Sequence, residues 1–223
     1  MTVVARAPMF QVLGAVAYGE KKAYEEASAK ATLAGTDQER RVWRKTAAEE
    51  LRHHKGFVRR LEALGADPER AMRPYRRALD RYHAATPRND LEEAVWSYLG
   101  EGVADDLLRW LKRVADRETS AFVDTVLADE VGHEERATAD LKRLLSEDPA
   151  RRAQVAGAAW RMLAHMGLSG LAGGPSLVRF GAFLRVGSTR ALLDQLVRGF
   201  STRLRALGLG PRDLLSSALP ITL

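Results

Sequence analysis

One arrangement of glutamate and histidine occurs twice in this chain and limits the folds that the chain can adopt. The segments Glu50-Leu-Arg-His53 and Glu130-Val-Gly-His133 each place a glutamate three residues before a histidine. Positions i and i+3 lie on one face of an α-helix, so both side chains of a pair can point the same way. Each pair also follows a single upstream glutamate, Glu20 by 30 residues and Glu101 by 29. The pattern predicts two similar helical hairpins, each offering two carboxylates and one imidazole.

The first hairpin is predicted over residues 8–34 and 36–64, where apolar residues recur at helical spacing. Pro8 is typical of the first turn of a helix, and Gly35 of the left-handed residue that ends one. The segment Thr36-Asp-Gln-Glu39 has the form of a capping box, which indicates the start of the second helix. Glu20 falls on the apolar stripe of the first helix. A carboxylate buried there must be paired or bound to a metal, because burying it alone costs several kcal/mol.

The second hairpin is predicted from a cap at Asn89 or Asp90 to about Val114, and from the segment 116–119 to about Ser146. Glu101 lies between two glycines, Gly100 and Gly102, in the middle of its helix. Glycine is a poor helix former that costs about 1 kcal/mol relative to alanine at such a position. Glycines there can admit a close neighbour or allow a local distortion of the helix.

The rest of the chain also has helical character. Residues 66–89 form a long connection with short helices of their own, and Asp148-Pro149 starts a further helix through about His165. The glycine-rich segment 167–175 predicts a loop, and one or two helices are expected within 176–207. No alternating strand pattern occurs, so the chain is predicted to be all-α. We expect a four-helix bundle with a long helical crossover over residues 1–148 and a C-terminal helical extension over residues 149–223.

Four carboxylates and two imidazoles in a four-helix core are the ligand set of a dinuclear metal site. The alternative is a bundle with buried glutamate–histidine hydrogen bonds and no metal. That alternative requires four carboxylates to be buried with few cations nearby in the sequence, which is costly. An oxygen-rich ligand set with two imidazoles suits iron or manganese better than a structural zinc ion.

On these motifs the chain resembles the ferritin-like di-iron carboxylate superfamily over roughly residues 8–146. The resemblance implies a ferritin-like four-helix bundle in which Glu50 and Glu130 bridge two metal ions. The terminal ligands that it implies for the two metals are Glu20 with His53, and Glu101 with His133. Open positions on the metals would bind dioxygen.

Some assignments around this site remain open from the sequence. His54, at position i+4 from Glu50, could also reach the core, although His53 is favoured because His133 has no histidine neighbour. Asp129, Glu49 and Asp105 could hydrogen-bond the ligands from outside. Asp105 could equally be solvated.

A narrower likeness concerns Ala17-Tyr-Gly-Glu20, Gly100-Glu-Gly102 and Leu127-Ala-Asp-Glu-Val-Gly-His133. With these segments the chain resembles the tRNA-hydroxylase branch, whose enzymes hydroxylate the isopentenyl group of a modified adenosine. The resemblance implies a non-haem di-iron, dioxygen-dependent hydroxylase acting on a modified tRNA nucleoside or on a small biosynthetic molecule. The alternative is a ferroxidase or a peroxide-detoxifying protein. An external reductase is implied, because the sequence has no flavin, nicotinamide or iron–sulfur signature.

The charge of the chain is uneven. Its net charge is +6, and residues 151–223 hold ten arginines against Asp194 and Asp213. This surplus favours an anionic partner such as tRNA, to which Arg198, Arg203 and Arg205 are expected to contribute. Arginine also outnumbers lysine 28 to 7 throughout, which a GC-rich genome would explain equally well.

Other features of the composition limit where the chain acts and with what. There are no cysteines, which excludes disulfides, iron–sulfur clusters and thiolate catalysis. No apolar run is long enough to span a membrane, and the first residues lack the layout of a secretory signal. A cytoplasmic location follows as the expectation. The helices expected beyond residue 148 exceed what a storage shell needs, so we expect a monomer or homodimer that binds a substrate.

Overall fold

The computed structural model describes residues 3–172 and 189–210, and all regular structure in these ranges is helical. The all-α prediction is therefore confirmed. The helices follow one another in the order α1 (Val3–Leu33), α2 (Asp37–Ala63), α3 (Pro68–Met72), α4 (Arg76–His83), α5 (Asp90–Val114), α6 (Arg117–Glu147), the 3₁₀ turn η1 (Pro149–Arg151), α7 (Arg152–Ala172) and α9 (Thr189–Ala206).

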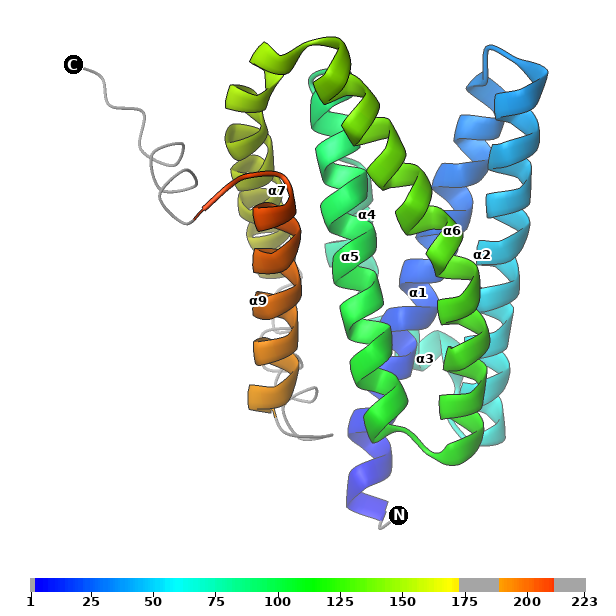
Figure 1. Cartoon of the computed structure of the whole chain (residues 1–223). Helices are drawn as coiled ribbons and strands as arrows, with labels where there is room; N and C mark the ends of the chain where they lie inside the picture. The colour runs from blue at the N-terminus through cyan, green and yellow to red at the C-terminus, as the bar shows by residue number, and fades with distance from the viewer. Residues whose placement is uncertain (1–2, 173–188, 211–223) are drawn as a thin grey trace. The chain divides into compact units, whose positions relative to one another are not determined.

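The described residues fall into two compact units (Figure 1). The first unit holds α1 to α4, and the second holds α5, α6, η1, α7 as far as Gly167, and α9 from Arg190. The predicted boundary between residues 148 and 149 is a different division, and it stays a prediction. Each unit contains one of the two hairpins expected from the doubled motif.

In the first unit, α1 and α2 pack side by side as a hairpin joined by a short turn (Figure 1). The predicted capping box is present: the Glu39 amide donates to Thr36 Oγ1 and the Thr36 amide donates to Glu39 Oε2, both at 3.1 Å. Gly65 has the left-handed φ of 82° expected of a residue that ends a helix. Gly35 does not, because the next residue, Thr36, is already the extended N-cap of α2 and α1 ends at Leu33.

The predicted crossover contains two short helices, α3 and α4, that pack on α1. A side chain at Gly14 would overlap the backbone of Ala71, so glycine lets α3 lie directly against α1. The Tyr18 hydroxyl donates a 2.7 Å hydrogen bond to Asp80 and thereby ties α4 to the same helix. Burial and this bond to an anion raise the pKa of Tyr18 to about 12. The crossover therefore braces the helix that carries Glu20.

The second unit has its own core. The α5/α6 hairpin begins at the caps Asn89 and Asp116, whose side chains accept from the first-turn amides. Apolar residues of α5, α6, α7 and α9 form one continuous buried cluster. The most fully buried members are Val95, Leu99, Leu141, Val155, Ala158, Ala159 and Met162. The helices after α6 are therefore packed elements of this unit.

Two boundaries differ from the sequence predictions. Helix α1 begins at Val3 and passes through Pro8, where the missing hydrogen bond falls close to the helix end. Helix α7 continues through Gly167 to Ala172. An isolated glycine weakens a helix but does not have to end it. The remainder of the predicted loop and any helix before Thr189 lie outside the described residues. Gly208, with a φ of 78°, follows α9 as expected of a terminating glycine.

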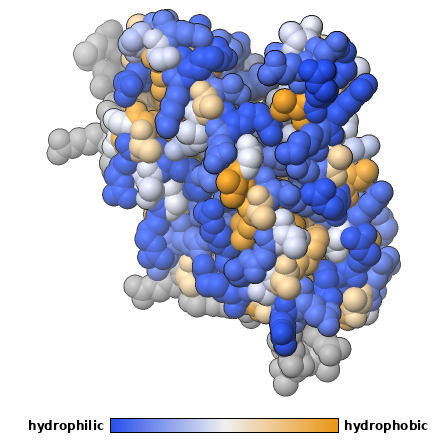
Figure 2. Space-filling view, turned by 45° about the vertical axis from the view of Figure 1, so that its right-hand side comes forward, coloured by the Kyte–Doolittle hydropathy of each residue, from blue (hydrophilic) through white to orange (hydrophobic). Residues whose placement is uncertain are grey.

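Among the described residues, no helix is long and apolar enough to cross a membrane. The face in Figure 2 is mainly hydrophilic, with hydrophobic residues in small groups.

Candidate metal centre

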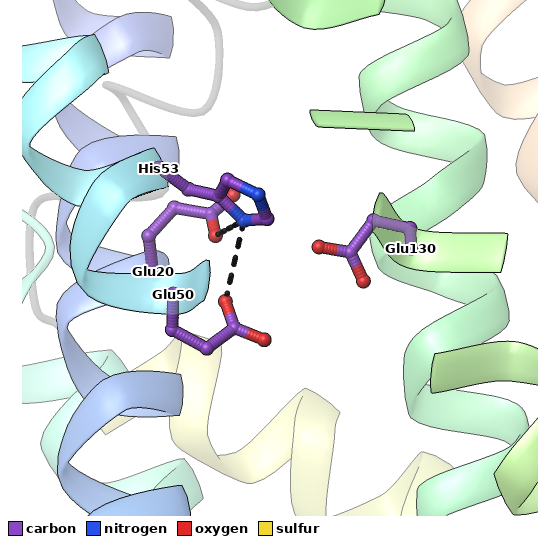
Figure 3. Close-up of side chains that lie close together, drawn as sticks. All are labelled: Glu20, Glu50, His53 and Glu130. Carbon is purple, nitrogen blue, oxygen red and sulfur yellow. Dashed lines mark ion pairs between the residues drawn. The ribbon is translucent and has the colours of Figure 1, made fainter. Parts of the chain in front are cut away.

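The first unit brings together Glu20 from α1 with Glu50 and His53 from α2 (Figure 3). We call these three residues the first triad. The His53 Nδ1 atom lies 3.4 Å from Glu20 Oε2 and 3.6 Å from Glu50 Oε2. Ligand atoms of all three side chains fall within 4.8 Å of one another. His53 is 1 % exposed and Glu50 is 5 % exposed, so the triad is shielded from water.

Helical periodicity places the first triad. On α2 the positions 47, 50, 53, 57 and 61 follow one stripe, and all five are buried. Ala47, Phe57 and Leu61 anchor this stripe against α1 through apolar contact. Two polar side chains, Glu50 and His53, occupy its middle, and Glu20 faces them from the neighbouring helix.

The neighbouring histidine has a different role. The His54 Nδ1 atom lies 2.7 Å from the carbonyl oxygen of Ala17, so its ring is turned to the backbone of α1. A ring nitrogen at this distance donates its hydrogen to the carbonyl. The structure thus groups His53, and not His54, with the two glutamates.

The second unit brings together Glu101 from α5 with Glu130 and His133 from α6, here called the second triad. Their ligand atoms also lie within 4.8 Å of one another. The His133 Nδ1 atom is 2.9 Å from Glu130 Oε2, and both side chains are buried. Glu101 is half-buried. The two triads therefore have the same composition and the same order along the chain.

The donor set of each triad suits a metal ion. Two carboxylates and one imidazole converge at a buried point, and a divalent cation there would offset the desolvation of the two carboxylates. Oxygen donors with one imidazole favour iron or manganese. In both triads the Nδ1 atom of the imidazole lies within 4 Å of a carboxylate oxygen, a detail that the sequence leaves open.

Two acidic residues near the triads, Asp105 and Glu49, are paired with cations. Asp105, one turn after Glu101, is buried and accepts a 2.7 Å hydrogen bond from Arg109. Burial raises the pKa of Asp105 to about 6, although the cation of Arg109 acts in the opposite direction. Glu49 lies 3.4 Å from Lys45. Asp129 is half-buried.

One arginine of residues 151–223, Arg203, lies in the interior of the second unit. Arg203 is 7 % exposed, donates a 2.7 Å hydrogen bond to Asp106, and lies 3.8 Å from Glu134, the residue after His133. A side chain at Gly102 would overlap the Arg203 side chain, and one at Gly199 would overlap Asp106.

The prediction that Arg203 helps to bind tRNA from the surface is therefore wrong. The guanidinium of Arg203 is buried and bonded to Asp106, so it lies in the interior of the second unit. The two glycines flanking Glu101 were compatible with a close neighbour or with a local distortion of the helix, and Gly102 proves to have the close neighbour. Nothing in the sequence identified that neighbour as Arg203. Arg198 and Arg205 are exposed.

Comparison with known proteins gives one family. Residues 5–168 match the family model described as "Ferritin-like domain, actinomycetes". This match covers both triads and most of the chain. No curated protein matches the sequence.

Proposed function

Because the chain belongs to the actinomycete family of ferritin-like domains, we propose that its two triads together hold two iron ions in a dioxygen-dependent hydroxylase. The observation that carries this proposal is the repetition of one buried donor set, Glu with Glu-x-x-His, in each hairpin. In the proposed centre Glu50 and Glu130, the glutamates of the two Glu-x-x-His pairs, would hold both metals. The terminal ligands are Glu20 with His53 and Glu101 with His133. Manganese is compatible with the same donors.

Two ferrous ions bound there would supply the reduction of dioxygen and the insertion of one oxygen atom into a substrate C–H bond. The balance of a hydroxylation is one substrate, one dioxygen, two electrons and two protons giving one alcohol and one water. The two electrons come from an external donor. The chain's own contribution is to hold the ions with carboxylates that offset their charge. Apolar neighbours such as Phe57 and Val126 exclude water.

Substrate oxygenation is preferred to iron storage because of the helices beyond α6. Residues of α7 and α9 share a core with α5 and α6, so these additional helices pack against the helices that carry the second triad. A storage shell has no need of these helices. The alternatives of a ferroxidase or a peroxide-detoxifying protein predict the same ligands, so metal binding and oligomeric state must be measured separately.

Metal stoichiometry tests the proposed centre. Protein reconstituted anaerobically should bind two Fe(II) ions per chain, and Glu50→Ala or Glu130→Ala should abolish binding of the pair because each is proposed to hold both metals. The matched controls are Glu62→Ala on α2 and Glu135→Ala on α6, two exposed carboxylates that should leave two ions bound. One ion or none in folded wild-type protein would remove the dinuclear proposal.

Oligomeric state separates the hydroxylase from the storage protein. We expect a monomer or dimer in sedimentation, with no mineral core. A 24-subunit particle, or hundreds of iron ions retained per particle, would establish storage instead.

Salt dependence tests whether the substrate is part of a tRNA. If α9 contacts phosphates, the affinity of tRNA should fall steeply between about 50 and 200 mM salt. The double variant Arg198→Gln/Arg205→Gln should flatten that slope, because both residues are exposed and are not part of either triad. A wild type without measurable tRNA affinity at the low salt concentration leaves a small biosynthetic molecule as the substrate.

A further inference from the structure

A groove of about 530 Å³ runs between α1 and α2 in the first unit. Small side chains make room for it: Ala31 and Ala47 are both buried along its floor. Leu51 adds apolar surface, and Tyr24 and Ser28 add hydroxyl groups. The groove is therefore largely apolar along its floor and polar at its edge.

The first triad does not line this groove, but residues at one end of the groove lie within about one helical turn of it. Tyr24 follows Glu20 by one helical turn, and Leu51 is the residue after Glu50. Ala47 precedes Glu50 by three residues, on the same buried stripe of α2. A molecule lying in the groove would thus have one end about one helical turn from the proposed metal ligands.

The other end of the groove carries positive charge. Arg40 and Arg44, one turn apart on α2, both line it. Arg40 is committed to Asp37 through an ion pair. Arg44 is exposed and forms no ion pair with any residue that the structure describes, so its guanidinium can take an anion from outside.

The distance along α2 sets the length of a molecule that fits. Arg44 and Glu50 are six positions apart on α2, which corresponds to about 9 Å of helix at 1.5 Å per residue. An extended chain of about seven carbon–carbon bonds covers the same length.

We propose that this groove binds an amphiphilic organic anion, with its carboxylate or phosphate at Arg44 and its apolar chain directed to the first triad. The role of this molecule as the hydroxylated substrate rests on the proposed function. The binding itself does not, because it requires only α1 and α2.

The experiment is a calorimetric titration of metal-free protein with octanoate, octyl phosphate and octan-1-ol. Octanoate or octyl phosphate should bind at least tenfold more tightly than the alcohol, and the better of the two identifies the preferred anionic group. Arg44→Gln should weaken binding of that anion about tenfold and leave the alcohol unchanged. The matched control is Arg59→Gln, an exposed arginine on the same helix that does not line the groove.

A second variant tests the position of the apolar chain. Ala47→Phe should fill the groove and abolish binding of both anion and alcohol, provided that circular dichroism shows an intact helical fold. Anion binding that is absent in wild type, or unchanged in both Arg44→Gln and Ala47→Phe, would overturn the proposal. Glu50→Ala should lose the metal pair and still bind the anion, so failure of the metal centre and failure of the groove give different results.

Discussion

The guanidinium of Arg203 on α9 donates a 2.7 Å hydrogen bond to the carboxylate of Asp106 on α5, and both side chains are less than 10 % exposed. Two glycines make this approach possible, Gly102 beside the arginine and Gly199 beside the aspartate. The pair joins residues 97 positions apart in the sequence. It fixes α9 to the helix that carries Glu101.

Removing the arginine should be strongly destabilising. Arg203→Met leaves the Asp106 carboxylate buried without its cation, which should lower the free energy of unfolding by about 3–5 kcal/mol. The double variant Arg203→Met/Asp106→Leu should recover most of this loss, because the buried carboxylate is removed together with its cation and the remaining partners, Glu134 and Arg109, are partly exposed to solvent. Urea unfolding of metal-free protein measures both. Arg198→Met, at an exposed position of the same helix, is the control and should have little effect.

Alanine substitution at two helical glycines should have opposite effects. A Cβ atom at Gly102 overlaps Arg203, so Gly102→Ala should destabilise the protein by about 1–3 kcal/mol. The Cβ of Gly132→Ala on α6 has nothing within 4 Å, so this variant should stabilise by about 0.5–1 kcal/mol through its helix propensity. Thermal unfolding of both variants checks the contrast. A stabilising Gly102→Ala would contradict the close packing of Arg203.

The triads and the glycines beside Glu101, Gly100 and Gly102, show how far the sequence could predict the structure. The triads were predictable because a spacing of three residues on a helix is a local property, and burial then follows from the apolar stripe. The glycines beside Glu101 left open either a close neighbour or a local distortion of the helix. That neighbour, Arg203, belongs to a tertiary contact between distant helices, and no local pattern distinguishes it from the exposed Arg198 and Arg205.

Helix ends were predicted less well than helix identity. The capping box of Thr36 and Glu39 is a direct hydrogen-bonding pattern, so the start of α2 was correct. Pro8 and Gly167 are statistical signals whose effect tertiary packing can override, and the helices continue past both. Which nitrogen of each histidine faces the carboxylates also depends on side-chain geometry that the sequence does not encode locally.

The adjacent histidines of α2 should separate metal binding from stability. His53→Ala should reduce the bound iron, because this imidazole belongs to the first triad. His54→Ala should leave the iron content unchanged and lower the free energy of unfolding by about 1 kcal/mol, because it removes only the hydrogen bond to Ala17. Iron analysis and urea unfolding of the two variants check this. Loss of iron in His54→Ala alone would reverse the assignment of the ligand.

The charge of Asp105 should make stability depend on pH. Burial raises the pKa of Asp105 from 3.8 to about 6, so the folded protein binds this proton more tightly than the unfolded chain does. The stability contributed by the neutral carboxyl is fully present below about pH 4 and is lost as the pH rises through about 6. A shift of this size corresponds to at most about 3 kcal/mol.

Asp105→Asn removes the titrating proton and keeps the shape of the side chain. Metal-free Asp105→Asn should therefore be more stable than wild type at pH 7.5, and this difference should disappear below about pH 4. The partner of Asp105, Arg109, is half exposed and can be solvated when its ion pair with Asp105 is lost. The increase in the free energy of unfolding should therefore persist at neutral pH. Urea unfolding at both pH values measures the difference, with Asp140→Asn at an exposed position as the control. A variant that is less stable than wild type at pH 7.5 would show that the ion pair with Arg109 outweighs the cost of burying the charge.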